Sequence, residues 1–259
     1  MSNNKKPRIG LALGGGGVRG GAHVGVLKVL EEYGIEIDLI AGTSAGSVVA
    51  ALFAHGYTAD DIAGIFVNAE LTDLLSLRPS RMGLMTPTGC SKLIKQHTND
   101  GRIENCKIPL YIVTADLISR RQIVFTEGET ALAVHASSAI PGLMNPVRHN
   151  GMLLADGGIL NNCPADIVRN AGADIVLAVN LHCIANFEPK NTMDIIFRAM
   201  DMVGDSITGD ALADWLVYPI DEPIGILEKH MIEKSMHLGE KAARASINQL
   251  LAILDKFSA

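Results

Sequence analysis

The sequence predicts an α/β fold in which a mostly parallel central sheet is flanked by helices. Short apolar runs, typical of strands buried on both faces, alternate with helical patterns, and the connections between them are short. No linker rich in Gly, Ser or Pro divides the 259 residues, and no internal repeat is visible. We therefore expect a single domain over residues 1–259.

The N-terminal part of the pattern is strand, helix, strand, helix. The first helix is expected to stop at Gly34, because glycine commonly ends helices. The four elements are predicted at residues 8–13, 22–33, 37–41 and 47–54. Residues 14–21 would form the loop between the first strand and the first helix.

The same alternation resumes near residue 109. Pro141 ends the helix predicted before it, because the residue preceding a proline avoids the helical conformation. Further strands are expected at 109–114, 122–125 (a hairpin partner or neighbour), 152–155, 174–180 and 216–219. Further helices are expected at 129–138, 192–212 and 236–257.

Residues 59–96 interrupt this regular pattern. Apolar pieces alternate there with the basic residues Arg78, Arg81, Lys92 and Lys95. Two interpretations stay open: a helical insertion that packs on the core, and a flap that covers the substrate and makes transient contact with a membrane surface.

The composition limits the partners. A net charge of −6 argues against a broad nucleic-acid surface, and the N-terminus lacks the apolar segment of a signal peptide. No apolar run approaches the ~20 residues that span a bilayer. We predict a cytoplasmic location, with a peripheral position at the inner membrane as a further option. The four cysteines lack zinc-ligand spacing, so we expect structural thiols and no metal.

The most informative stretch is a Gly-x-Ser-x-Gly pattern at residues 42–46. It follows an expected strand and precedes an expected helix, so Ser44 would lie on a sharp turn with its hydroxyl exposed. Side chains at Gly42 and Gly46 would clash in so tight a bend. The helix N-terminus after the serine offers N–H groups and a partial positive charge. Ser44 is therefore a candidate nucleophile for acyl transfer.

Four consecutive glycines, Gly14 to Gly17, follow the first strand, and Gly20 completes a Gly-x-Gly-x-x-Gly pattern. Two functions fit this loop: a cradle for a nucleotide or another phosphate, and an oxyanion hole for an attacked carbonyl. Because parallel strands end at the same edge of a sheet, the loop and the serine turn can meet over one crevice. Asp38 lies near the spacing of a ribose-binding acid, but a nucleotide site leaves the serine turn unexplained.

The serine needs a base, and Asp156 is the best candidate. It follows a short apolar strand and precedes Gly157 and Gly158, which would hold it in a tight loop. Partial burial would raise its basicity. A Ser–His–Asp triad stays open as well, with His182 as the leading histidine, because it lies late in the chain at the end of an apolar strand.

Taken together, three motifs resemble those of the patatin-like phospholipases. In the order and rough spacing of that family, they are the glycine loop at 14–20, the serine turn at 42–46 and the Asp-Gly-Gly at 156–158. Residues 136–141 and 162–164 are similar to the family too. The resemblance covers most of a core at 8–180, with 181–259 as its helical C-terminal completion. The chain looks most like the small, single-domain bacterial members.

The resemblance implies a three-layer α/β fold and a Ser–Asp dyad instead of a triad. Ser44 would be the nucleophile and Asp156 its general base, with backbone N–H groups around Gly15, Gly16 and Gly17 as the oxyanion hole. Arg19 matches the family's arginine, for which we favour a role in anchoring the loop. The remaining motif positions are Gly14, Gly20, Gly42, Gly46, Gly157 and Gly158.

The activity that the resemblance implies is hydrolysis of an acyl ester through an acyl-serine intermediate, without metal or organic cofactor. Phospholipids, lysophospholipids or other acyl esters would be the substrates. Two alternatives stay open: a nucleotide- or phosphate-binding protein that uses the glycine loop, and a regulatory protein that keeps the fold but acts through partners. The oligomeric state stays unknown from the sequence.

Overall fold

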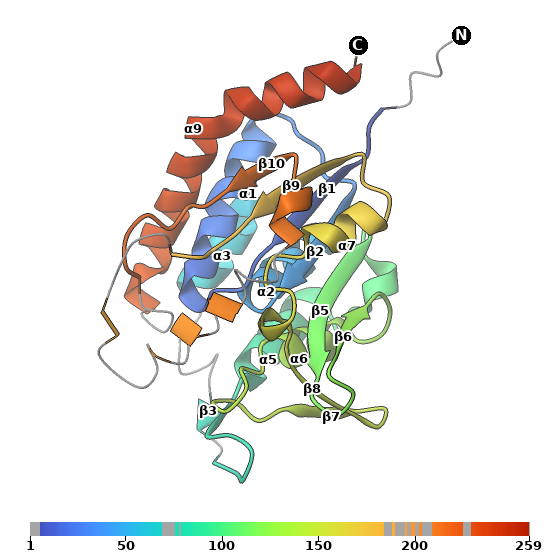
Figure 1. Cartoon of the computed structure of the whole chain (residues 1–259), viewed down its shortest axis with the longest axis vertical. Coiled ribbons are helices and arrows are strands. Elements are labelled where there is room, and N and C mark those ends of the chain that lie inside the picture. Colours follow the sequence, from blue (N-terminus) through green and yellow to red (C-terminus); the bar gives the residue numbers. More distant parts are fainter. Residues whose placement is uncertain are drawn as a thin grey trace.

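A computed structural model describes residues 6–68, 76–77, 79–183, 188–189, 195, 198–199, 202–203, 209–224 and 229–258. Its centre is an eight-stranded sheet in the order β10-β9-β1-β2-β5-β8-β7, with β6 paired to β5 (Figure 1). The strands are β1 Ile9–Leu13, β2 Leu39–Thr43, β5 Leu110–Asp116, β6 Arg121–Phe125, β7 Val147–His149, β8 Met152–Asp156, β9 Ile175–Val179 and β10 Trp215–Val217. The run from β10 to β5 is parallel, whereas β6, β7 and β8 pair antiparallel.

Helices cover both faces of the sheet, with α1 and α9 on one side of the parallel strands and α7 on the other (Figure 1). The helices are α1 Gly21–Glu32, α2 Ala45–Ala54, α3 Ala59–Asn68, α5 Thr88–Thr98, α6 Thr130–Ser137, α7 Ala165–Asn170 and α9 Ile232–Ser258. The prediction of a three-layer α/β fold with a mostly parallel sheet is therefore confirmed.

The two faces of β1 carry side chains of different size and belong to cores of different size. Leu11 and Leu13 belong to the large core on the side of α1, whereas Ala12 belongs to the small core on the side of α7. Gly10 also faces α7, since a Cβ there would lie 2.9 Å from the Cβ of Val168. Small side chains on this face let the short helix α7 approach the sheet closely.

Most predicted elements agree closely with the observed ones. The strand predicted at 37–41 is displaced toward the serine turn, and the short elements β7 and α7 were not predicted. Residues 59–96 hold helices α3 and α5 and a two-stranded ribbon, β3 Ser76–Leu77 with β4 Met85–Thr86. The helix expected at 192–212 falls mostly outside the described residues, and its end, Gly209–Leu212, is a 3-10 turn.

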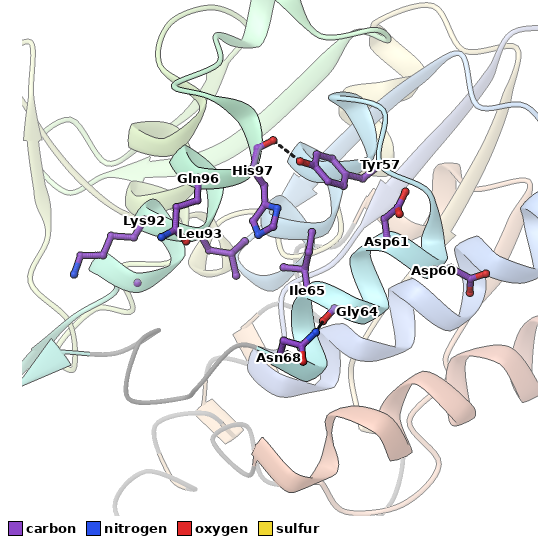
Figure 2. Close-up of a pocket in the computed structure, with 11 residues that line it drawn as sticks. Tyr57, Asp60, Asp61, Gly64, Ile65, Asn68, Lys92, Leu93, Gln96 and His97 are labelled. Carbon is purple, nitrogen blue, oxygen red and sulfur yellow. Dashed lines mark hydrogen bonds between the residues drawn. The ribbon is translucent and has the colours of Figure 1, made fainter.

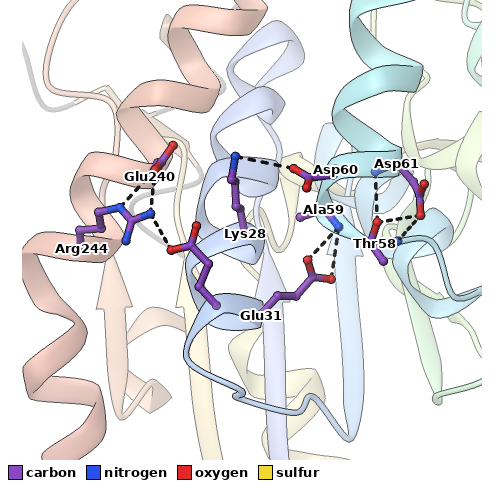
Figure 3. Close-up of polar contacts among 9 residues, drawn as sticks. Lys28, Glu31, Thr58, Ala59, Asp60, Asp61, Glu240 and Arg244 are labelled. Carbon is purple, nitrogen blue, oxygen red and sulfur yellow. Dashed lines mark hydrogen bonds and ion pairs between the residues drawn. The ribbon is translucent and has the colours of Figure 1, made fainter.

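The C-terminal helix α9 packs backbone to backbone against α1. A Cβ at Gly25 would lie 2.0 Å from the carbonyl oxygen of Met236, and a Cβ at Gly239 would lie 2.0 Å from that of Ala22. Ion pairs at the surface accompany this contact. Arg244 of α9 lies 2.6 Å from Glu32 of α1, and Figure 3 shows the same guanidinium beside Glu240 of its own helix. Helix α1 is thereby fixed against α9 as well as against the sheet.

Strands β2 and β8 lie end to end along one edge of β5. Thr43, the last residue of β2, is paired with Val113, and Asp156, the last residue of β8, is paired with the next residue, Thr114. Because β6 occupies the opposite edge over the same stretch of β5, β2 and β8 must share this one. The residues that follow β2 and end β8 therefore meet at one point.

No helix in the described part of the chain combines the length and the apolar character needed to cross a bilayer.

Candidate active site

Ser44 lies on the turn between β2 and α2, at the junction of β2 and β8. Its backbone has φ of 51° and ψ of −121°, a conformation with positive φ that is rare for a residue with a side chain. The two flanking glycines are required by close approach, as predicted. A Cβ at Gly46 would lie 2.1 Å from the carbonyl oxygen of Leu13, and one at Gly42 would lie 2.5 Å from that of Gly46.

The Ser44 hydroxyl donates a hydrogen bond to the carboxylate of Asp156. The distance from Ser44 Oγ to Asp156 Oδ2 is 2.6 Å, and both residues are buried. The other carboxylate oxygen, Oδ1, accepts from the N–H of Gly158 at 2.8 Å. Burial raises the pKa of Asp156 to about 6, against the opposing effect of these two hydrogen bonds. A carboxyl group with this pKa can accept and return a proton near neutral pH.

Ser137, which has no role in the sequence-based prediction, is hydrogen-bonded to the backbone of the serine turn. Ser137, at the end of α6, accepts a hydrogen bond from the N–H of Ser44 at 2.8 Å and donates its own proton to the carbonyl of Val113 at 2.7 Å. It thus joins the turn to β5. The only signal in the sequence was its place in the stretch 136–141.

The glycine loop lies beside the serine turn. A Cβ at Gly15 would lie 3.0 Å from the Cβ of Ser44. The N–H of Gly15 donates to the carbonyl of Asn162 at 3.1 Å, so the geometry does not support the expectation that Gly15 gives a donor to the oxyanion hole. Within the residues that the structure describes, the N–H groups of Gly16 and Gly17 donate to no protein acceptor.

The remaining motif glycines serve close packing around the same point. Gly20 packs against Ala45 of the serine helix, and Gly157 packs against the carbonyl of Val113 on β5. The N–H of Gly14 donates to Val179 of the neighbouring strand β9 at 3.0 Å. The glycine loop, the serine turn and the Asp-Gly-Gly turn are therefore one packed unit.

Arg19 is buried. Its Nε donates to the carbonyl of Ile224 at 3.0 Å, and its Nη1 lies 3.4 Å from the carbonyl of Leu181. The guanidinium thus connects the glycine loop to two distant segments of the chain.

A histidine is not part of this cluster in the described part of the chain. Neither Ser44 nor Asp156 is hydrogen-bonded to an imidazole. His182 lies after β9, where its backbone N–H donates to the side chain of Asn180 at 2.9 Å. The structure therefore brings Ser44 and Asp156 together and does not assemble a triad through His182.

A cavity of about 770 Å³ lies between α3 and α5, in the segment that was expected to be an insertion or a flap. Figure 2 shows its lining, in which polar side chains stand beside Ile65 and Leu93. Tyr57 there donates to the carbonyl of His97 at 2.6 Å. Neither Ser44 nor Asp156 lines this cavity. Among the described residues, no group of three or more His, Cys, Asp or Glu side chains could hold a metal ion.

Comparisons with known proteins agree with this architecture. A family model described as Patatin-like phospholipase matches residues 11–169. Patatin-like phospholipase domain-containing protein 7 of Rattus norvegicus is 37% identical over 182 residues, which are 67% of this chain and 13% of that protein. Lysophospholipase NTE1 of Yarrowia lipolytica is 32% identical over 226 residues, which are 84% of this chain and 15% of that protein.

The chain thus spans a small part of the length of these relatives. Among solved structures, VipD from Legionella pneumophila is similar, with a TM-score of 0.58, 14% sequence identity, and coverage of 98% of this chain and 67% of that one. At this identity, the similarity supports the fold.

Proposed function

The chain belongs to the patatin-like phospholipase family, and we propose on this premise that it hydrolyses acyl esters of lipids with a Ser44–Asp156 dyad. The observation that carries the proposal is the 2.6 Å hydrogen bond between Ser44 Oγ and a buried carboxylate. The raised pKa of Asp156 supports it, because a more basic carboxylate is a better proton acceptor for an alcohol.

In the first step, Ser44 Oγ attacks the ester carbonyl carbon while its proton passes to Asp156 Oδ2. The carbonyl oxygen becomes an oxyanion, for which the N–H groups of Gly16 and Gly17 are the proposed donors. The tetrahedral intermediate then collapses, and the bond to the alcohol oxygen breaks. Asp156 returns its proton to that oxygen, which leaves an acyl-serine and a free alcohol.

In the second step, water attacks the acyl-serine carbonyl and gives a proton to Asp156. The same donors hold the second oxyanion. Collapse releases the fatty acid, and the proton returns to Ser44 Oγ. Asp156 thus serves as base and acid in each half of the cycle, and a base with a pKa of about 6 suits both roles.

The proposed substrates are phospholipids, lysophospholipids or other acyl esters. The relative from Yarrowia lipolytica is named a lysophospholipase, which supports this class. The nucleotide-binding alternative has less support, because the N–H groups of Gly14 and Gly15 already donate to protein carbonyls. In addition, the first residue of α1 is covered, since a Cβ at Gly21 would lie 2.6 Å from the carbonyl of Ile232.

Turnover of p-nitrophenyl esters and of lysophosphatidylcholine by the wild type and by Ser44→Ala tests the function. We expect release of alcohol and fatty acid by the wild type only, and covalent labelling of Ser44 by a fluorophosphonate probe. His182→Ala is the matched control, and it should retain turnover. An inert wild type, or a Ser44→Ala variant with full turnover, would contradict the proposal.

We further propose that residues 81–84 touch a membrane surface. Met82 and Leu84 are 47% and 60% exposed, and Arg81 between β3 and β4 is exposed as well. The N–H of Leu84 donates to the carbonyl of Leu143, in the segment after α6, so these residues lie near the helix that supports Ser44. Apolar side chains beside a basic one favour an anionic lipid surface.

Sedimentation with vesicles of phosphatidylglycerol tests this contact. The double variant Met82→Ser and Leu84→Ser should stay in the supernatant, whereas the wild type should pellet. Tyr33→Ser is the control. Tyr33 is 46% exposed, but it follows the C-terminal end of α1 and so lies near the N-terminal ends of the parallel strands, whereas Ser44 lies at their C-terminal ends. If the wild type fails to pellet with vesicles of any composition, the proposed contact is contradicted. The cytoplasmic location stays a prediction.

A further inference from the structure

His23 of α1 is fully buried, and the mechanism proposed above does not use it. Its Nε2 lies 2.7 Å from the carbonyl oxygen of Gly14, at the start of the glycine loop. A carbonyl oxygen can only accept, so the proton of this hydrogen bond must be on Nε2. The other ring nitrogen, Nδ1, has no hydrogen-bond partner in the part of the chain that the structure describes.

Both polar groups of the Gly14–Gly15 peptide, its carbonyl and its N–H, are hydrogen-bonded. The carbonyl of the Gly14–Gly15 peptide accepts from His23, and the N–H of the same peptide donates to the carbonyl of Asn162 at 3.1 Å. With both polar groups held on opposite sides, this peptide plane cannot rotate without breaking a buried hydrogen bond. Such a break would leave a buried polar group without a partner, which is unfavourable.

The two N–H groups that follow are the proposed oxyanion donors. The carbonyl of Gly16 accepts from the N–H of Arg19 at 3.2 Å, so the far side of the loop is held too. Glycines have little intrinsic preference for one conformation, and Gly17 has a positive φ of 59°. The peptides that carry the N–H groups of Gly16 and Gly17 are held through their own carbonyls, that of Gly15 at 3.5 Å from Asn162 Nδ2 and that of Gly16 by Arg19. Without the hold at Gly14, these two longer contacts alone would set the direction of the N–H groups.

Helix α1 gives His23 a fixed position. It is pressed against α9 on both sides of this residue, because a Cβ at Gly21 would lie 2.6 Å from the carbonyl of Ile232 and one at Gly25 would lie 2.0 Å from that of Met236. Burial lowers the pKa of His23 to about 4, so the ring is neutral at physiological pH. It supplies a donor without placing a positive charge in the core.

We propose that His23 is a positioning residue for the oxyanion hole: it fixes the Gly14–Gly15 peptide and thereby aims the N–H groups of Gly16 and Gly17 at the ester carbonyl oxygen. The proposal rests on the acyl-hydrolase function proposed above. An oxyanion hole accelerates the reaction only when its donors are held in place before the charge develops. The residue should therefore affect the transition state and leave substrate binding almost unchanged.

The test compares His23→Leu, His23→Gln and His23→Asn with the wild type. A glutamine amide can place a donor near the position of Nε2, whereas the shorter asparagine cannot reach Gly14. Each variant is assayed with p-nitrophenyl butyrate for kcat and KM. Each is also assayed with a trifluoromethyl ketone of the same acyl chain, which forms a hemiketal on the serine with its oxyanion in the hole.

We expect His23→Leu and His23→Asn to lower kcat by about 10- to 100-fold with KM nearly unchanged. The inhibition constant of the ketone should rise by a similar factor. His23→Gln should recover most of both losses. The control is His55→Leu. His55 is partly buried and hydrogen-bonded to the hydroxyl of Thr130 at 3.2 Å, but it lies outside the loop, so kcat and ketone affinity should be retained.

Three results would overturn the proposal while the acyl-hydrolase function stands. They are a folded His23→Leu variant with full kcat, a loss of kcat without weaker ketone inhibition, and a glutamine variant no better than asparagine. If His23→Leu does not fold, the comparison of Gln with Asn still decides, because both variants bury an amide. An inert wild type, or turnover that survives Ser44→Ala, would instead overturn the proposed function and this proposal with it.

Discussion

The two ends of the β5–β8 strand pair each carry a buried aspartate, and the two carboxylates have opposite properties. Asp116 ends β5 and Asp156 ends β8, and because the strands are antiparallel these residues lie at opposite ends of the paired stretch. The pKa of Asp116 is lowered to about 2, whereas that of Asp156 is raised to about 6. The same residue type in the same two-strand unit therefore has two different uses.

Hydrogen-bond donors and burial together explain the difference, because burial is the largest influence on the pKa of Asp156 and hydrogen bonding is the largest on that of Asp116. Asp116 accepts from the hydroxyl of Ser119 at 2.6 Å, which is the largest influence on its pKa, and from three backbone N–H groups, those of Ile118, Ser119 and Leu153. These donors stabilise the ionised form.

Asp156 has a single backbone donor and the Ser44 hydroxyl, so the desolvation of its charge prevails. Asp116, with four hydrogen-bond donors, stays ionised and stabilises the turn after β5. Asp156, with two donors, can take up and release a proton near neutral pH.

The largest expected effect comes from removing the ionisable group at Asp156. Asp156→Asn should lower kcat by about 10³-fold or more, because the base is lost while the side chain keeps its shape. The amide can still accept from Gly158 and contact Ser44, so the fold should be retained. Steady-state hydrolysis of p-nitrophenyl butyrate measures the loss, and circular dichroism checks the fold. A variant with near wild-type kcat would show that the two aspartates do not differ in function.

The same substitution should stabilise the protein, in a defined pH range. The folded pKa of Asp156 is above the unfolded value, so the folded state binds more protons between pH 3.8 and about 6. This contribution to stability is present at low pH and is lost as the pH rises through about 6. The shift corresponds to at most ~3 kcal/mol.

Asp156→Asn should therefore have a higher Tm than the wild type at about pH 8 and a similar Tm at about pH 4. Thermal unfolding at both pH values, followed by circular dichroism, checks this. A variant that is less stable than the wild type at the higher pH would contradict the account of a poorly satisfied carboxylate.

Asp116→Asn should have the converse phenotype. The amide cannot accept from all four donors, so the turn after β5 loses hydrogen bonds and the Tm falls. Because the folded pKa of Asp116 is below the unfolded value, its contribution is present above the unfolded pKa and is lost as the pH falls toward about 2. Calorimetry and ester hydrolysis measure the two effects. The kcat of this variant should remain near the wild-type value, and a large drop in kcat at unchanged stability would break the comparison.

The smallest predicted effect concerns the backbone of Ser44. Its positive φ is unfavourable for a residue with a Cβ, so Ser44→Gly should be more stable than Ser44→Ala by ~1 kcal/mol, although glycine usually destabilises an ordered position. Both variants lack the proposed nucleophile, which removes catalysis from the comparison. Equal stability of the two would indicate that the turn stores little strain.

The sequence predicted the parallel sheet and the three turns because both depend on local patterns. Apolar runs of strand length specify the strands, and glycines beside Ser44 and Asp156 specify tight turns. The short helix α7 was missed because its few residues show no clear helical period. The segment 59–96 was difficult because α3 and α5 are separated by a small ribbon.

The supporting residues of the site could not be predicted in the same way. Ser137 and Asn162 act through hydrogen bonds to residues far away in the chain, which leave no periodic signal in the sequence. Gly15 was assigned as a donor because the glycines look equivalent in sequence, and only the register against Asn162 distinguishes its N–H from those of Gly16 and Gly17. The contact of His23 with Gly14 depends on how closely α1 packs beside the glycine loop, which no local pattern in the sequence specifies.

The pH dependence of kcat/KM for the wild type and for His182→Ala tests the central claim, that a buried aspartate activates Ser44 without a histidine. With p-nitrophenyl butyrate between about pH 4.5 and pH 8, both proteins should show one acidic limb with an apparent pKa of about 6. The limb should be the same in the two proteins. An inactive His182→Ala variant, or a limb that this substitution removes or shifts, would contradict the claim.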